Sequence, residues 1–171
     1  MRVPSSEISK VSKPLKITIA GVRGVVGETL TPDLLVNFSQ AFGTYMGPGR
    51  VLVSRDTRAS GRMVEPCVCS GLTATSSEVV KLGVCPTAAL QLAVRQSDAV
   101  GGIAITAGHN SAPWNALKFC RGDGIYLNAK QAEELLNVYH QKEFTKAAWD
   151  ELPPVGRDDL AGERHLEAIR E

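Results

Sequence analysis

The sequence predicts a three-layer α/β/α domain, in which helices cover both faces of a mixed and mostly parallel sheet. Short apolar segments with strand character alternate with amphipathic helical segments from residue 16 to about residue 140. This alternation is typical of strand–helix–strand units, whose strands lie parallel in one sheet. A tight turn precedes the last strand, which we therefore expect to run antiparallel. The 171 residues suffice for one domain with its own core.

The first predicted elements are a strand, a glycine-rich loop and a helix. Residues 16–20 alternate and include β-branched side chains, which predicts a strand. Three glycines within residues 21–27 favour a loop with a tightly bent backbone. Thr31 is a typical helix N-cap and Pro32 suits the first helical position, so a helix begins there. The glycines at 47–49 end it.

The middle of the chain predicts two further strand–helix pairs. Residues 50–54 and 78–82 have the apolar character of buried strands. A helix should begin near Ser60, but Pro66 lies inside its pattern and predicts a kink or a late start. A short helix should follow Pro86.

The remaining segments predict the other side of the sheet. Residues 101–106 and 116–120 are expected strands, and the turn at 122–124 leads to the final strand at 125–127. Asn128 then caps the last helix of the domain.

We expect three regions along the chain. Residues 1–15 are polar and form a flexible lead-in, and residues 16–145 form the domain. Residues 146–171 are a linker, marked by the prolines at 153–154, followed by the start of a helix that belongs to a truncated second domain.

Composition excludes several classes of protein. The net charge is +1 and aromatic residues make up 5%, so nucleic acid is not an expected partner. No apolar run approaches the roughly 18 residues that span a membrane, and no secretion signal is visible. The spacing of the four cysteines is not that of a zinc site, so we expect free thiols and a cytoplasmic location.

The candidate site residues lie in three loops that follow predicted strands, at 21–24, 55–58 and 106–110. In such a sheet, ligands bind beyond the carboxyl ends of the parallel strands. Cations and glycine-rich backbone amides together suit a phosphate group. The alternative for each arginine alone is an ordinary solvated loop residue. The positively charged or titratable side chains of this set are Arg23, Arg55, Arg58, His109 and Lys118.

The same segments, in the same order, resemble the motifs of the α-D-phosphohexomutase family. This family includes phosphoglucosamine mutase, phosphomannomutase and phosphoglucomutase, and the resemblance implies the fold of phosphoglucomutase domain I. The resemblance covers residues 17 to about 140. Its motifs are Gly21–Gly24 with Leu30–Pro32, Arg55–Arg58 with Ser60–Gly61, Leu82–Gly83 with Pro86–Thr87, and Gly102–Asn110 with Trp114–Phe119.

The resemblance implies a missing phosphoryl carrier. The family interconverts hexose or hexosamine 1-phosphate and 6-phosphate through a phosphoserine and a bisphosphate intermediate, which is covalent catalysis by a hydroxyl. Gly108 occupies the phosphoserine position and cannot be phosphorylated. Thr106 and Ser111 are nearby hydroxyls, but a displacement of about 1 Å can cost roughly a hundredfold in rate. We therefore expect the chain to be inactive on its own.

The resemblance also implies roles for the neighbouring residues. His109 and Lys118 are candidates for acid–base catalysis near the sugar hydroxyls, and Arg23 for holding the loop or the transferring phosphate. Thr106, Ala107 and Asn110 would support the loop, as would Arg55 and Arg58. For the last two arginines, purely structural pairing with Asp56 or with helix ends is the alternative.

The family's Mg²⁺ is held by the phosphoserine and an aspartate-rich loop of the second domain, so no complete metal site is expected in this chain. The implied partners are a hexose or hexosamine phosphate, bound weakly or not at all by the isolated domain, and the remaining domains. The alternatives are a stand-alone pseudoenzyme or interaction module and a homodimer, because a lone first domain exposes apolar surface.

Overall fold

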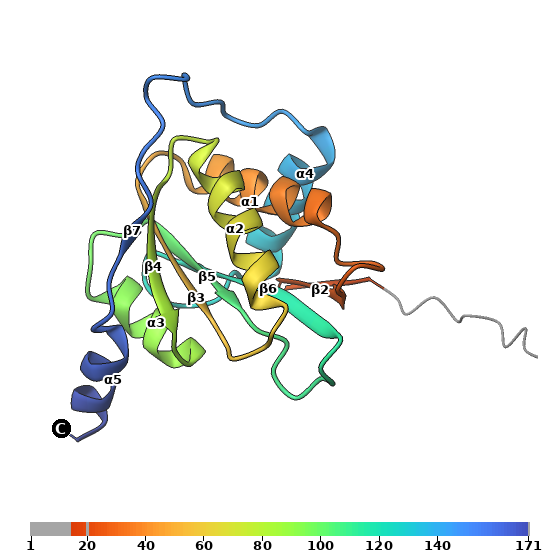
Figure 1. Ribbon diagram of the computed structural model, residues 1–171. Helices are drawn as coiled ribbons and strands as arrows, with labels where there is room; N and C mark the ends of the chain where they lie inside the picture. Colours follow the sequence, from red (N-terminus) through yellow and green to blue (C-terminus); the bar gives the residue numbers. More distant parts are fainter. Residues whose placement is uncertain (1–14, 20, 171) are drawn as a thin grey trace, which may run out of the picture.

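The computed structural model describes residues 15–19 and 21–170, which form a seven-stranded mixed sheet between two layers of helices (Figure 1). The strands lie in the order β1-β2-β6-β5-β3-β4-β7. The predicted fold class is confirmed. The strands are β1 (Lys16–Thr18), β2 (Gly21–Val25), β3 (Arg50–Arg55), β4 (Glu78–Val84), β5 (Gly101–Ile105), β6 (Trp114–Arg121) and β7 (Gly156–Arg157).

The sheet has a parallel half and an antiparallel half. Strand β3 is parallel to both β4 and β5, and β7 continues this arrangement beside β4. Strand β6 is antiparallel to β5 and to β2, and β1 is antiparallel to β2. Within the described residues, parallel and antiparallel pairings are therefore equal in number, and the antiparallel part is larger than the single strand expected from the sequence.

The helices form the two outer layers. Helices α1, α2 and α4 cover one face of the sheet, and α3 and α5 cover the other (Figure 1). The larger core lies under the first group, where the rings of Phe42 and Phe119 stack with centroids 5.0 Å apart. The helices are α1 (Pro32–Met46), α2 (Gly61–Thr73), α3 (Thr87–Arg95), α4 (Ala129–Gln141) and α5 (Ala161–Arg170).

The expected helix starts are present. The Thr31 hydroxyl accepts a hydrogen bond from the N–H of Leu34 at 3.4 Å, and Asn128 caps α4 together with Gln131. Pro66 does not delay α2, which begins at Gly61 and continues through the proline. No helix among the described residues is both long and apolar enough to cross a membrane.

Two sequence interpretations are wrong. Residues 21–24 were expected to be a loop but belong to β2. Gly21 is needed because its φ is +128° and because an added Cβ would lie 1.9 Å from the Leu117 carbonyl oxygen. Glycine here reflects close approach between strands rather than a turn. Residues 125–127 form no strand; only Tyr126 forms a bridge, to Cys120.

The C-terminal segment contacts the sheet and one of its helices. Strand β7 pairs with β4 at the edge of the sheet, and α5 packs against α3. Ala161 at the start of α5 is buried in the smaller core. Of the expected lead-in, residues 1–14 lie outside the described residues, as does position 20 of the first predicted strand.

Candidate functional site

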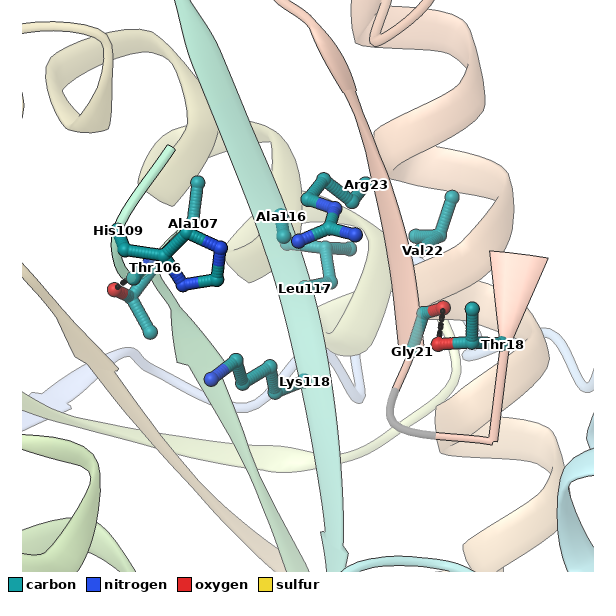
Figure 2. Close-up of a pocket in the computed structure, with 11 residues that line it drawn as sticks. Thr18, Gly21, Val22, Arg23, Thr106, Ala107, His109, Ala116, Leu117 and Lys118 are labelled. Carbon is teal, nitrogen blue, oxygen red and sulfur yellow. Dashed lines mark hydrogen bonds between the residues drawn. The ribbon is translucent and has the colours of Figure 1, made fainter. Parts of the chain in front are cut away.

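The candidate site is a pocket of about 220 Å³ between β2, β6 and the loop that follows β5. Figure 2 shows Arg23, His109 and Lys118 directing their side chains toward a common space. These three residues come from three separate segments of the chain, and the structure brings them together. The lining consists of Thr18, Gly21, Val22, Arg23, Thr106, Ala107, Gly108, His109, Ala116, Leu117 and Lys118.

Strand alternation places Arg23 and Lys118 on the same face of the sheet. Leu117 and Val22 pair across β2 and β6 and point into the larger core. Their neighbours along the strands therefore point to the opposite face, because successive side chains alternate. On that face, α3 contacts β3 and β5. Arg23 on β2 and Lys118 on β6 lie beyond β5, on the side of the sheet away from β3.

The loop that follows β5 is held by its own short hydrogen bonds. The N–H of Gly108 donates to the Thr106 hydroxyl at 3.2 Å. The Asn110 side-chain amide donates to the Ala107 carbonyl at 2.6 Å. Gly108 has φ +57°, in the left-handed region that glycine adopts at little cost. An added Cβ at Gly108 would meet no atom within 4 Å, so the space beside this residue is open.

Arg58 holds the same loop from outside the pocket. Its guanidinium donates to four carbonyl oxygens, those of Gly108, Asn110, Ser111 and Trp114, at 2.8, 2.7, 2.9 and 3.2 Å. It also pairs with Asp56 at 3.0 Å. Arg58 does not line the pocket, and its donors are used by the backbone. In this geometry Arg58 fixes the path of the loop from outside the pocket lining.

Arg55 lies apart from this pocket. Its Nε is 3.8 Å from a carboxylate oxygen of Glu65, and its Nη1 donates to the Asp56 carbonyl. It lines a different cavity of about 130 Å³, together with Lys81 and Arg157. The structure therefore separates the two arginines of the 55–58 loop, which sequence reasoning treated alike.

The pocket is electropositive. Arg23 and Lys118 form no ion pair within the described part of the chain. The Lys118 ammonium lies 6.0 Å from the ring centroid of Tyr126, whose pKa is raised by burial and which therefore stays neutral. No aspartate or glutamate lines the pocket. Unpaired guanidinium and ammonium groups suit a phosphate group.

The positively charged side chains of the pocket do not suit Mg²⁺, whose preferred ligands are carboxylate and phosphate oxygens. The described residues contain no group of three His, Cys, Asp or Glu side chains that could hold a metal ion. The chain's described residues thus do not by themselves fit a magnesium site.

Sequence reasoning missed several lining residues. Thr18 lies near the end of β1, and its hydroxyl donates to the Gly21 carbonyl at 3.4 Å. Ala116 on β6 also lines the pocket. The alternation of Lys118 with Leu117 could have indicated which face of β6 is functional, but the pairing of β6 with β2 is not visible in the sequence.

The fold and the pocket define an α/β/α domain with an electropositive pocket at one edge of its parallel strands, and comparison with known proteins specifies the class of domain further. Residues 15–146 match the family described as phosphoglucomutase/phosphomannomutase, alpha/beta/alpha domain I. The chain belongs to this family. Members of the family are phosphohexomutases and use Mg²⁺.

The similar proteins are longer than this chain. A phosphoglucosamine/phosphogalactosamine mutase of Sulfurisphaera tokodaii is 40% identical over 151 residues, which are 87% of this chain and 33% of the relative. A phosphoglucomutase/phosphomannomutase of Thermococcus kodakarensis is 34% identical over 155 residues, which are 88% of this chain and 34% of the relative. The chain thus spans about a third of the length of the curated relatives it matches.

Solved structures agree with the fold. A phosphoglucomutase/phosphomannomutase family protein from Burkholderia thailandensis superposes with a TM-score of 0.77 at 25% identity. The match covers 90% of this chain and 36% of the other.

Proposed function

We propose that this chain is the phosphate-binding domain of a phosphohexomutase-type protein and that it binds a hexose or hexosamine phosphate in the pocket beside Gly108. The observation that carries the proposal is the convergence of Arg23, Lys118 and His109 on one cavity without a carboxylate. Two unpaired cations would neutralise a phosphate dianion, and the imidazole at the rim could exchange a proton with a sugar hydroxyl.

The proposal includes the absence of phosphoryl transfer. Gly108 has no hydroxyl, and the nearby hydroxyls of Thr106 and Ser111 belong to other positions of the loop. The Thr106 hydroxyl accepts a hydrogen bond from the Gly108 N–H and so supports the loop. Because a misplaced nucleophile loses most of its rate, neither hydroxyl replaces the serine.

The proposed inactivity is tested with purified chain, glucose 1-phosphate and glucose 1,6-bisphosphate as activator, with Mg²⁺ present. We expect no glucose 6-phosphate above the level of a blank. Clear turnover at a rate proportional to protein concentration would refute this part of the proposal.

Phosphosugar binding is tested separately by calorimetric titration with glucose 6-phosphate. Arg23→Met and Lys118→Met should each weaken binding by roughly tenfold or more, since a charge-assisted hydrogen bond contributes about 1.5–3 kcal/mol. Lys130→Met is the control, because Lys130 is exposed on α4 and pairs only with Glu134 among the described residues. Equal affinities for all four proteins, or no binding to the unchanged protein, would end the proposal.

We further propose that residues 146–171 lead toward the remaining domains found in the longer relatives, and that the parent protein is cytoplasmic, in keeping with its four free thiols. Mg²⁺ would be shared with those domains.

A second candidate is a stand-alone interaction module that forms a homodimer. It is favoured by the exposed side chains of Leu166 and Ile169 on α5, and Ile169 lines a groove of about 450 Å³ with Leu92 and Ile125. Sedimentation equilibrium decides this candidate: a monomer at high micromolar concentration excludes it, and a dimer that Ile169→Ser dissociates supports it.

A further inference from the structure

Lys118 has small neighbours on its own face of the sheet. Ala104 lies directly opposite it on β5, and Ala116 precedes it by two residues on β6. On β2, Gly21 approaches so closely that an added Cβ there would lie 3.1 Å from the Lys118 Cα. None of these residues has a side chain long enough to hold a lysine, although Figure 2 shows Lys118 reaching toward the pocket. A fixed position for its ammonium therefore requires a contact from another element.

Tyr126 provides that contact from the segment after β6. Its bridge to Cys120 is antiparallel, so its side chain lies on the same face as those of Cys120 and of Lys118, two residues earlier. Diagonal neighbours of this kind are within reach of an aromatic ring and a long side chain. The Lys118 Nζ lies 6.0 Å from the centroid of the Tyr126 ring, which agrees with the range of about 6 Å for a cation–π contact.

The ring of Tyr126 is itself held in place. The Arg121 N–H donates to the Ile125 carbonyl at 2.8 Å. The Leu127 N–H donates to the Phe119 carbonyl at 3.4 Å, so the residues on both sides of Tyr126 are bonded to β6. The ring packs against the smaller core, and burial raises the pKa of its phenol, which stays neutral. An uncharged ring on an anchored backbone is a fixed surface beside the lysine.

The ring also acts against the electrostatic repulsion inside the pocket. Arg23 and Lys118 line the same pocket without a carboxylate, and neither forms an ion pair within the described part of the chain. Because like charges repel, the flexible lysine of the empty pocket is driven away from the arginine. The electron-rich face of an aromatic ring attracts an ammonium and opposes this movement.

We propose that Tyr126 is a positioning residue, whose ring holds the Lys118 ammonium at the pocket before a ligand arrives. Tyr126 does not itself line the pocket, so it acts through Lys118. Its effect on phosphosugar binding rests on the function proposed above, whereas the restriction of the lysine side chain does not.

The first test follows Lys118 directly, without a ligand. In protein labelled with ¹³C at the lysine Cε atoms, the Lys118 signal is the one that Lys118→Met removes. We expect Tyr126→Leu to remove its ring-current shift and to make it relax as a more mobile group, whereas Tyr126→Phe keeps the ring and both properties. Tyr45→Leu is the matched control, because it also removes a partly buried tyrosine ring, but from the larger core. An unchanged Lys118 signal in Tyr126→Leu would overturn the proposal.

The second test is calorimetric titration with glucose 6-phosphate. Tyr126→Leu should weaken binding by roughly two- to fivefold, which corresponds to an exposed cation–π contact, and Tyr126→Phe and Tyr45→Leu by less than about twofold. In protein that already carries Lys118→Met, Tyr126→Leu should have no further effect, because the side chain that it positions is gone. An equal loss with and without Lys118 would show a general structural role and overturn the proposal.

The outcomes separate this inference from the proposed function. Thermal unfolding shows that each variant is folded at the titration temperature, and Tyr126→Met replaces Tyr126→Leu if the latter unfolds. If the unchanged protein does not bind glucose 6-phosphate, the proposed function is wrong, and the Lys118 signal still decides whether the ring holds the lysine. If glucose 6-phosphate binds and removal of the ring changes neither the Lys118 signal nor the affinity, the proposed function stands and the positioning role is refuted.

Discussion

Replacing Arg58 by methionine should release the loop that forms one wall of the pocket. Methionine keeps much of the apolar stem and removes the guanidinium, which donates to four backbone carbonyls between Gly108 and Trp114. The side chain is only 14% exposed, so the stem packs while the head binds the loop.

The expected cost follows from these bonds. A hydrogen bond to a charged group contributes about 1.5–3 kcal/mol, but bonds that share one guanidinium are not additive. The carbonyls of Gly108 and Ser111 lie on exposed residues and can return to water. We therefore expect a loss of about 3 kcal/mol, which lowers the melting temperature by roughly 6–12 °C for a domain of this size.

The assay is thermal unfolding, combined with hydrogen exchange of the 106–114 amides. Arg62→Met is the control, since Arg62 is exposed on α2 and makes no ion pair among the described residues. It should shift stability by less than about 0.5 kcal/mol. Arg58→Lys should not rescue the loop, because an ammonium lacks the planar fork. Equal melting temperatures for the Arg58→Met and Arg62→Met proteins would refute the reasoning.

Three further outcomes are expected. Gly21→Ala should prevent folding or lower the melting temperature by more than any surface change, because its Cβ would lie 1.9 Å from the Leu117 carbonyl oxygen; a normal melting curve would contradict this. The hydrogen bond from Arg164 lowers the pKa of Asp158 below its ordinary value. The stability that this bond gives α5 is therefore fully present above the ordinary carboxyl pKa, and it is lost as the pH falls through the lowered pKa of Asp158. Asp158→Asn should remove this pH dependence of α5 hydrogen exchange, and an unchanged acid profile would count against it. Burial raises the pKa of the Cys69 thiol to about 11 and that of the Cys120 thiol to about 12. A disulfide reagent at pH 8 should therefore label at most one cysteine quickly in the folded protein, the half-buried Cys67, and all four after unfolding. Rapid labelling of a second thiol in the folded protein would be inconsistent with the structure.

The local signals in the sequence predicted most of the fold. The caps at Thr31 and Asn128 and the apolar strands at 50–54 and 101–106 depend on neighbours within a few residues, and each is found near its expected position. The parallel half of the sheet follows from alternation of strands and helices.

The failures have a common physical cause. A glycine can provide a positive φ in a turn or permit close approach of another backbone, and sequence alone does not separate the two. At residues 21–24 close approach is involved: β6 passes so closely that only glycine fits at Gly21, whose φ is also positive, while Thr29 crowds Gly24. The antiparallel half of the sheet was missed for this reason.

The sequence indicated which residues belong to the candidate site better than it indicated how they are arranged. Arg23, His109 and Lys118 meet in one pocket, but through alternation on β2 and β6 as well as through a loop. Arg55 and Arg58 are three residues apart and looked equivalent in the sequence. Their different surroundings depend on where the 106–114 loop passes, which is a tertiary contact without a local signal.

The two-residue strand β7 has a consequence for handling the protein. It pairs with Val80 and Lys81 in the middle of the outer side of β4, whose backbone donors and acceptors would otherwise be free there. An exposed strand edge of this kind pairs with strands of other molecules. A shortened version ending before residue 156 should therefore form intermolecular β-structure and precipitate at concentrations where the longer chain stays dispersed.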